Sequence, residues 1–278
     1  MPSRSLMLGA LVCLSATAQL ALDSSLVRAE DEQAVVPSLH ELSQTGEAAA
    51  SYEGDYENGI PHGKGVMTWP NGDRYEGDFA EGNRSGRGTY SWGAESEWAG
   101  HRYEGDFQEG RRTGRGTYTW ANGDRYEGDF IEGERSGKGV WTGADGGSYE
   151  GDFVEGQFHG RGILTWPNGQ RYEGDFVEGR MQGKGVMLRS NGDRYEGDFL
   201  DDQPAGQGLW VRADGVRYEG QFANGEPQGD GLYTWQEGTT FEGQFLDGGP
   251  HGSGTCRSPS GRTARCEYDR GRFLRWLE

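Results

Sequence analysis

The chain has 278 residues, of which only 32% are hydrophobic, while 51 are glycine. This composition argues against one or two ordinary globular domains, in which nearer half of the residues are apolar. The formal net charge of −18 repels nucleic acid and anionic bilayers, which excludes nucleic acid as a natural partner. Low hydrophobicity with high charge is typical of disorder, but 9 Trp, 13 Tyr and 11 Phe at fixed spacing predict an ordered repeat protein.

Residues 1–18 have the pattern of a secretory signal peptide. Arg4 precedes the apolar run LMLGALVCLSATAQLAL, and Ala16 and Ala18 supply the small residues of a cleavage site. An uncleaved anchor is the alternative, and a lipid anchor on Cys13 is disfavoured by Val12 beside it. We therefore expect export, to the periplasm or cell envelope of a bacterium and otherwise to secretion. Residues 19–51, with RAEDEQ and the short helical pattern PSLHELSQ, are expected to be a mostly flexible acidic linker.

A five-residue phrase then recurs along the chain. YEGDF begins at Tyr75, Tyr103, Tyr126, Tyr149, Tyr172 and Tyr195, and weaker spellings begin at Tyr52, Tyr218 and Phe241. The period is 23 residues, except for 28 between Tyr75 and Tyr103. A leucine-rich repeat would need a leucine lattice, which is absent. The array of copies spans residues 52–263.

Each copy predicts a two-stranded hairpin, and the fold class is therefore all-β. Alternation places Tyr, Gly and Phe of YEGDF on one face of a strand and Glu and Asp on the other. The segment GRGTYTW at 114–120 alternates likewise, with Gly114, Gly116, Tyr118 and Trp120 on one face. Turn signals follow the two strands at 109–110 and 121–124. The glycines would let large rings lie flat over bare backbone.

The pattern Y-E-G-D-F-x-E-G-x-x-x-G-[KR]-G resembles the MORN (membrane occupation and recognition nexus) repeat. Two small departures are Phe or Tyr where the family often has Trp, and Asp202 in place of a turn glycine. The resemblance implies an elongated, twisted, single-layer meander of antiparallel strands that serves as an interaction platform. About 18 strands at about 4.8 Å each would run on the order of 85 Å. The family's self-association and exposed edge strands imply a homodimer.

The aromatic face is the first candidate binding surface. Its rings replace a core, and they would also line a groove for peptides, helices or extended glycans. The predicted residues are Tyr75, Phe79, Trp92, Tyr103, Phe107, Trp120, Tyr126 and Phe130. The longer second copy, SWGAESEWAGHRY, adds five residues that include Trp98 and His101. This loop would either confer binding specificity or fold back on the aromatic rings.

The Glu and Asp residues of YEGDF form a repeated acidic row. Paired carboxylates serve glycosidases, but many near-identical pairs indicate a surface motif rather than two carboxylates in different environments. The spacing matches no calcium loop. Cross-strand ion pairs are expected with Lys64, Arg87, Arg115, Lys138, Arg161 and Lys184. Gln207, Asp230 and Ser253 follow at the same position, which predicts an under-compensated acidic end.

A disulfide is predicted at the end of the array. If Trp69 pairs with Tyr75 across the turn between copies, the same register eight copies later places Cys256 opposite Cys266. Our hypothesis is that this bond replaces aromatic stacking at the terminal cap. A redox or metal role lacks a CxxC motif or a second ligand pair. Residues 264–278, the basic apolar C-terminus, are expected to form a capping strand or short helix; docking to a membrane or a partner is the alternative.

No motif for catalysis is found in the sequence. It lacks a G-x-S-x-G elbow, a zinc-ligand cluster and a phosphate-cradling loop followed by a helix. We therefore predict a protein that is not an enzyme and has no cofactor or metal. The predicted function is an exported scaffold for an unidentified protein partner. The alternatives are a membrane- or lipid-associated protein and an envelope glycan-binding protein.

Overall fold

The structure, a computed structural model, describes residues 50–277. The predicted signal peptide, and the predicted linker up to residue 49, lie outside this part. The described residues form twenty β-strands and no helix. They divide into an N-terminal unit, residues 50–167, and a C-terminal unit, residues 168–277. Each unit is described by itself.

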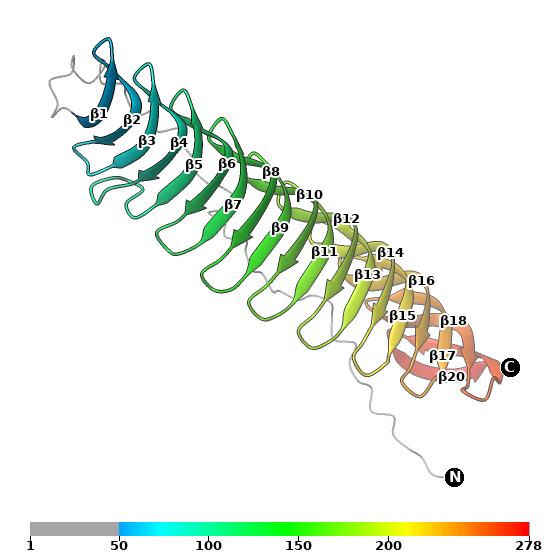
Figure 1. The fold of residues 1–278 in the computed structure, drawn as a ribbon. Helices are drawn as coiled ribbons and strands as arrows, with labels where there is room; N and C mark the ends of the chain where they lie inside the picture. Colours follow the sequence, from blue (N-terminus) through cyan, green and yellow to red (C-terminus); the bar gives the residue numbers. More distant parts are fainter. Residues whose placement is uncertain (1–49, 278) are drawn as a thin grey trace. The chain divides into compact units, whose positions relative to one another are not determined.

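The N-terminal unit is a ten-stranded antiparallel meander in which each strand pairs with the next. Its hairpins follow one another in chain order (Figure 1, blue to green). The strands are β1 (Ser51–Glu57), β2 (Ile60–Thr68), β3 (Arg74–Ala80), β4 (Asn83–Ser91), β5 (Arg102–Gln108), β6 (Arg111–Thr119), β7 (Arg125–Ile131), β8 (Glu134–Thr142), β9 (Ser148–Val154) and β10 (Gln157–Thr165).

The C-terminal unit repeats this topology with ten further strands. They are β11 (Arg171–Val177), β12 (Arg180–Leu188), β13 (Arg194–Leu200), β14 (Gln203–Val211), β15 (Arg217–Ala223), β16 (Glu226–Thr234), β17 (Thr240–Leu246), β18 (Gly249–Arg257), β19 (Thr263–Asp269) and β20 (Arg272–Leu277). The predicted all-β meander of hairpin repeats is therefore confirmed within each unit.

Two kinds of turn alternate along the chain. The short turn occupies two residues, such as Glu109 and Gly110, whose φ angles of 49° and 81° are those of a type I′ turn. The long turn occupies five residues, 69–73 in the first copy. There Asp73 N donates to Asn71 Oδ1 at 3.1 Å, a local bond that holds the chain in the turn. The turn residues at 109–110 and 121–124 were correctly predicted.

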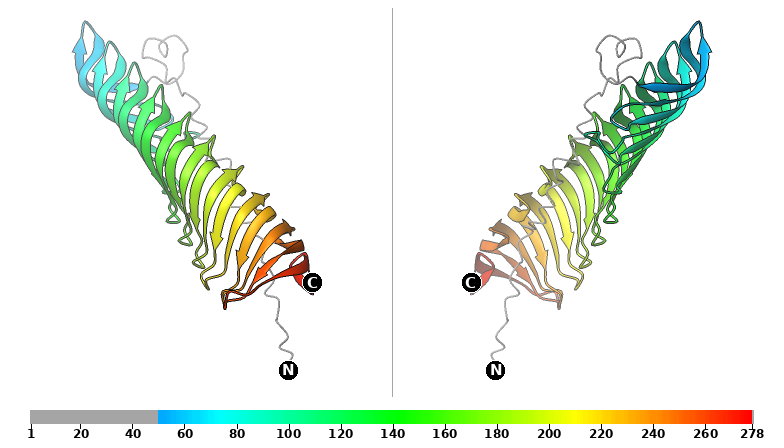
Figure 2. Two further views of the ribbon diagram at one scale, coloured as in Figure 1. Left: turned by 90° about the vertical axis from the view of Figure 1, so that its right-hand side faces the viewer. Right: turned by 90° about the vertical axis from the view of Figure 1, so that its left-hand side faces the viewer.

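A β-bulge bends the strands of each repeat. Gly105 lies opposite Gly116, but the next residue, Asp106, lies opposite Thr113, so that two extra residues sit on β6. The Asp106 carboxylate accepts a hydrogen bond from Arg115 N at 3.2 Å and so closes the bulge. Most other copies repeat this bond, and the strands are visibly curved in Figure 2.

The aromatic core lies inside this bend. Tyr75 Oη donates to Asp78 O at 2.9 Å, and its ring covers Gly88 so closely that an added Cβ would lie 2.5 Å from Tyr75 Cζ. Phe79 packs edge-on against Tyr75 and against the Tyr52 ring of the preceding copy, with centroids 5.1 and 4.9 Å away. The same zigzag repeats along each unit. Both the predicted face assignment and the predicted role of the glycines are confirmed.

The predicted register between copies is wrong by two residues along the strand. Tyr75 lies opposite Met67 rather than Trp69, and the last pair before the turn is Thr68 with Arg74. Trp69 belongs to the turn, since its amide donates to Asp73 O at 2.9 Å. The bond between Asp73 N and Asn71 Oδ1 makes Arg74 the first strand residue, which the hydrophobic pattern alone does not specify.

The predicted disulfide joins Cys256 to Cys266, with Cα atoms 5.9 Å apart. The corrected register nevertheless places Cys256 opposite Ala264, and Cys266 opposite Gly254. The bond therefore runs diagonally between β18 and β19. Residues 263–277 form the β19–β20 hairpin, so the strand alternative for the C-terminal segment is right and the helix alternative is wrong.

Candidate functional site

The predicted aromatic face separates into a buried and an accessible part. Six of the predicted side chains are almost fully buried in the bend of the strands: Tyr75, Phe79, Tyr103, Phe107, Tyr126 and Phe130. The other four, Trp92, Trp98, His101 and Trp120, are half-buried. The accessible four lie in or beside the long turns, and they define the candidate site.

The insertion in the second copy is an ordered loop. Trp92 N donates to His101 O at 3.1 Å, and His101 N donates to Trp98 O at 3.0 Å. Gly93 lies directly against Gly72 of the preceding turn, where a Cβ would collide with backbone. Its amide donates to Asp73 Oδ1 at 2.8 Å. Contacts to the neighbouring copy therefore fix this loop, although its sequence departs from the repeat.

His101 occupies the place of a turn aspartate. Asp73, in the turn of the first copy, accepts a hydrogen bond through Oδ2 from Tyr90 Oη of the second copy at 2.8 Å. One copy later His101 Nδ1 lies 2.7 Å from Tyr118 Oη, so the ring nitrogen takes over the contact that the carboxylate makes. His101 precedes Arg102 as Asp73 precedes Arg74, and this equivalence is readable from the aligned copies.

The four half-buried side chains form one aromatic cluster with Tyr118. The Trp98 and His101 rings are 5.6 Å apart, and Trp92 lies 5.5 Å from Tyr118. Trp120 contacts the other side of Tyr118 at 4.7 Å. The insertion thus folds back on the aromatic face, and it also adds accessible ring surface there.

Three arginines beside these rings were missed in the sequence, and one of them, Arg135, is itself buried. Arg84, Arg112 and Arg135 place their guanidinium groups 4.9 Å from Tyr90, 5.3 Å from Tyr118 and 5.2 Å from Trp120. Each also donates to a carbonyl of the next short turn, at Gly110, Gly133 and Gly156, over 2.7–2.8 Å. Burial lowers the pKa of Arg84, and the Arg112 charge lowers it further. The aligned sequence does contain a sign of these residues, since arginine occupies the same repeat position in three consecutive copies.

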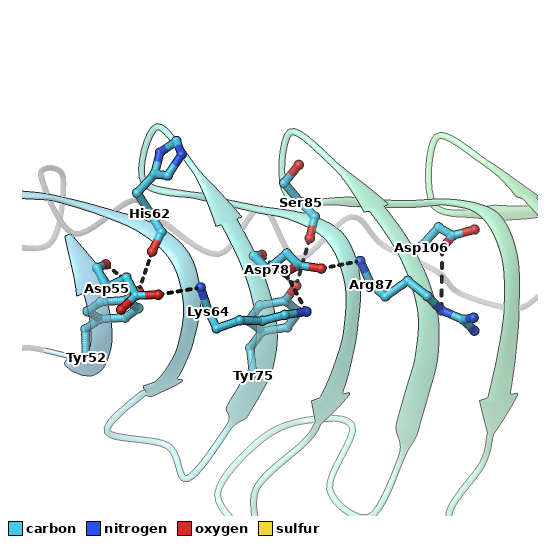
Figure 3. A network of polar contacts seen from close by, with 9 residues as sticks. All are labelled: Tyr52, Asp55, His62, Lys64, Tyr75, Asp78, Ser85, Arg87 and Asp106. Atoms are coloured by element: carbon cyan, nitrogen blue, oxygen red, sulfur yellow. Dashed lines mark hydrogen bonds and ion pairs between the residues drawn. The ribbon is translucent and has the colours of Figure 1, made fainter. Parts of the chain in front are cut away.

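The opposite face carries the acidic row. Five of the six predicted cations form the expected cross-strand pairs, and Lys64 Nζ lies 2.6 Å from Asp78 Oδ1 (Figure 3). The others are Arg87–Asp106, Arg115–Asp129, Lys138–Asp152 and Lys184–Asp198. These exposed pairs contribute little individually. The aspartates therefore have a structural role, closing the bulge with one oxygen and pairing with a cation through the other.

The prediction of an under-compensated acidic end is wrong at the first of its three positions and is not contradicted at the other two. Gln207, which lacks the basic charge, lies opposite Gln221 rather than an aspartate. Asp230 likewise lies opposite Gln244. At Gln207 acid and base are therefore lost together, whereas Asp230 puts an acid in the place of the base. Ser253 lies opposite Glu267, which pairs with Arg275. The sequence signal for the lost aspartates was YEGQF in place of YEGDF.

Within residues 50–277, no group of three or more His, Cys, Asp or Glu side chains is placed to hold a metal ion. The same part of the chain contains no helix long and apolar enough to cross a membrane.

Comparison with known proteins identifies the repeat. The family model described as MORN repeat matches more than half of the chain, in nine consecutive segments. They are residues 52–74, 75–94, 103–125, 126–148, 149–171, 172–194, 195–217, 218–240 and 241–261. Curated proteins give no match.

Several solved structures show distant likeness. The TCP10 domain of Danio rerio CPAP, in complex with a peptide of Danio rerio STIL, is 14% identical, with a TM-score of 0.45 over 82% of this chain and 99% of that one. The TCP domain of Drosophila melanogaster SAS-4, with a proline-rich motif of Ana2, is 15% identical, with a TM-score of 0.29 over 73% and 83%. Virginiamycin B lyase from Staphylococcus aureus is 9% identical, with a TM-score of 0.15 over 78% and 73%. We draw no functional conclusion from scores at this level.

Proposed function

The chain belongs to the MORN repeat family, and from that premise we propose that it is an exported, non-enzymatic scaffold that binds protein partners. The proposed contact surface is the aromatic cluster of Trp92, Trp98, His101 and Trp120. The family model supports a repeat-based platform. One observation supports the choice of this contact surface: the cluster brings half-buried rings together at the point where the repeat is interrupted.

The chemistry of the surface favours a protein partner. Tryptophan and arginine are enriched at the energetic centres of protein interfaces, because they bury large area and also form directional contacts. Here the Arg112 guanidinium stands over Trp92 at 5.9 Å, and the insertion is held by hydrogen bonds before any partner arrives. A preorganised surface of this kind loses little conformational entropy on binding.

A photo-crosslinking side chain at position 98 tests the proposal. In the native compartment it is expected to form a discrete protein adduct, and Trp92→Ala is expected to weaken that adduct. The matched control is the same probe at Trp235, a half-buried tryptophan outside the cluster. Equal adducts from both positions, or none from position 98, would contradict the proposed surface.

The two alternative functions predict different binding. Lipid association predicts co-sedimentation with liposomes that persists at high salt, whereas the net charge of −18 opposes binding to anionic vesicles. Glycan recognition predicts retention on cell-wall polysaccharide that is lost in Trp98→Ala, because sugar rings stack on exposed tryptophan. Either result without a protein adduct would replace the proposed function.

Export has its own test. We expect the N-terminus of the protein purified from its native cell to begin after Ala18. An intact Met1 in a cytosolic fraction would overturn this part of the proposal.

A further inference from the structure

The described strands begin and end with different halves of the repeat. β1 is a strand of the YEGDF type, whereas β20 has the place of the second strand of a hairpin, since it pairs with β19 as β6 pairs with β5. Both β1 and β20 have one strand neighbour within the structure. Open edges of this kind present unpaired backbone groups to another chain.

Inside the N-terminal unit, each second strand is joined to the next YEGDF strand by a repeated ion pair. Arg115, on β6, lies opposite Asp129, on β7, and pairs with its Oδ1. In the equivalent pair Asp78 uses Oδ1 for Lys64 and Oδ2 for Arg87 N, as Figure 3 shows. Each internal aspartate therefore has one oxygen for the strand after it and one for the strand before it.

The two terminal strands carry the two partners of this repeated ion pair, an aspartate on β1 and an arginine on β20. Asp55 on β1 accepts Lys64 N through Oδ2 at 3.2 Å, and within residues 50–277 it has no ion pair. Arg275 on β20 has the place of Arg115 when counted from Trp276, which lies opposite Cys266 as Gly116 lies opposite Gly105. The bulge of this hairpin is one residue shorter, so that Arg275 also lies opposite Glu267 on β19. Arg275 Nε bonds to Glu267 at 2.7 Å on its own hairpin and faces no following strand among those described.

The aromatic faces of the two end strands are also complementary. An internal phenylalanine such as Phe79 packs between two tyrosines and is only 3% exposed. Tyr56, at the same position on β1, has the Tyr52 ring alone and is 57% exposed. On β20 the Trp276 side chain replaces a glycine and is 61% exposed. Among the described residues, Tyr56 on β1 lacks the ring of a preceding copy, and the Trp276 ring on β20 has no following strand to pack against.

We propose that a second copy of the chain occupies each end, with β20 of one copy pairing antiparallel with β1 of the next. Extending the internal register places Arg275 opposite Asp55, Trp276 opposite Gly54 and Leu274 opposite Tyr56. The pairing completes the ion pair and brings the Trp276 ring towards Tyr56. Because different surfaces meet, the contact does not close on itself, and it builds head-to-tail chains.

Sedimentation velocity of the full chain over a range of concentrations tests this contact. Wild type is expected to form a ladder of oligomers beyond the dimer. Asp55→Lys and Arg275→Glu each place like charges opposite one another, and each is expected to weaken association about tenfold. The matched control is Glu150→Lys, which makes the same charge change on the exposed face of an internal strand and leaves the ladder intact.

Mixing the variants separates head-to-tail contact from a symmetric dimer. In an equimolar mixture of Asp55→Lys and Arg275→Glu, the two unlike variants meet with opposite charges at both of their β20–β1 contacts. The mixture is therefore expected to recover the ladder that neither variant forms alone, whereas a symmetric dimer would not extend. The double variant restores opposite charges at both ends and is expected to recover the ladder. A wild-type monomer at all concentrations, or a wild-type dimer unaffected by Asp55→Lys, overturns the proposal.

Discussion

The most constrained single residues are the glycines beneath the tyrosine rings. Gly88 has an ordinary negative φ, so its backbone does not require glycine. What excludes a side chain is Tyr75, whose ring atoms occupy the space of a Cβ. The phrase YEG is thus a packing rule: the ring needs a strip of backbone without side chains on its own strand and on the next.

Gly88→Ala is therefore expected to destabilise the protein. The methyl group forces the fully buried Tyr75 ring out of its position, at a cost of about 1–3 kcal/mol as for other overpacked cores. Urea denaturation measures the change. The control is Gly59→Ala in a short turn, where a Cβ meets nothing within 4 Å but φ is +80°, so that only backbone strain of about 1 kcal/mol is added. A Gly88 variant no less stable than the Gly59 variant would contradict the packing rule.

At the scale of the hairpin, the sequence predicts which residues form strands and turns, but it does not predict the register that the geometry of the long turn sets. Alternation of ring, glycine and ring assigns faces, because a strand has a period of two residues. The register depends on an Asx bond between Asp73 and Asn71, a local interaction to which hydrophobic pattern is blind. Arg84 escaped the sequence analysis for a related reason, since charge predicts exposure unless aromatic neighbours and a free carbonyl accept the guanidinium.

The candidate site was predicted only in part. Trp98 and His101 were recognised as an interruption of the repeat, and both are half-buried, with Trp98 against His101 and His101 against Tyr118. The rings were expected to replace a core, but the complete burial of Tyr103, which removes it from any binding surface, depends on the bulge that folds each strand over its own rings. Glycine content reveals close packing, but not the direction in which a strand bends.

The terminal hairpin supplies a prediction at the same scale. Replacing Cys256 and Cys266 by serine removes the covalent link between β18 and β19 and is expected to cost about 2–3 kcal/mol for a loop of this length. Hydrogen exchange is expected to accelerate in β19 and β20 and to stay unchanged in β11–β14. A thiol assay on the denatured wild type is expected to find no free thiol from this pair. Uniform acceleration through β11–β20 would indicate that the bond stabilises more than its own hairpin.

At the scale of the whole molecule, the buried tyrosines make the free energy of unfolding depend on pH in the alkaline range. Burial raises the pKa of Tyr233 to about 12. Burial also raises the pKa of Tyr75, Tyr90, Tyr103, Tyr126, Tyr149, Tyr195 and Tyr218. The pKa of each tyrosine is thus higher in the folded protein than the value of about 10 in the unfolded chain. The neutral, buried tyrosines therefore stabilise the fold fully below pH 10, and this contribution to the free energy of unfolding is lost as the pH rises through the pKa of the folded protein.

The free energy of unfolding is therefore expected to fall steeply above pH 10, with each tyrosine contributing up to about 1.4 kcal/mol per pH unit. Urea titrations between pH 8 and pH 12, followed by circular dichroism and tyrosinate absorbance, measure the slope. Most tyrosinate is expected to appear together with loss of structure. Ionisation of most tyrosines near pH 10 with the native spectrum retained would contradict the burial of these rings.

The register between neighbouring strands has a consequence for how the number of repeats can change in evolution. Within each unit the ring contacts and ion pairs of one copy recur in the next, so a strand meets equivalent partners wherever a whole copy is gained or lost. In-frame duplication or deletion of one repeat therefore changes the length of the array while the same strand register is kept at the new junction. Selection can thus adjust the number of copies separately from the second-copy insertion and the cysteine-linked end.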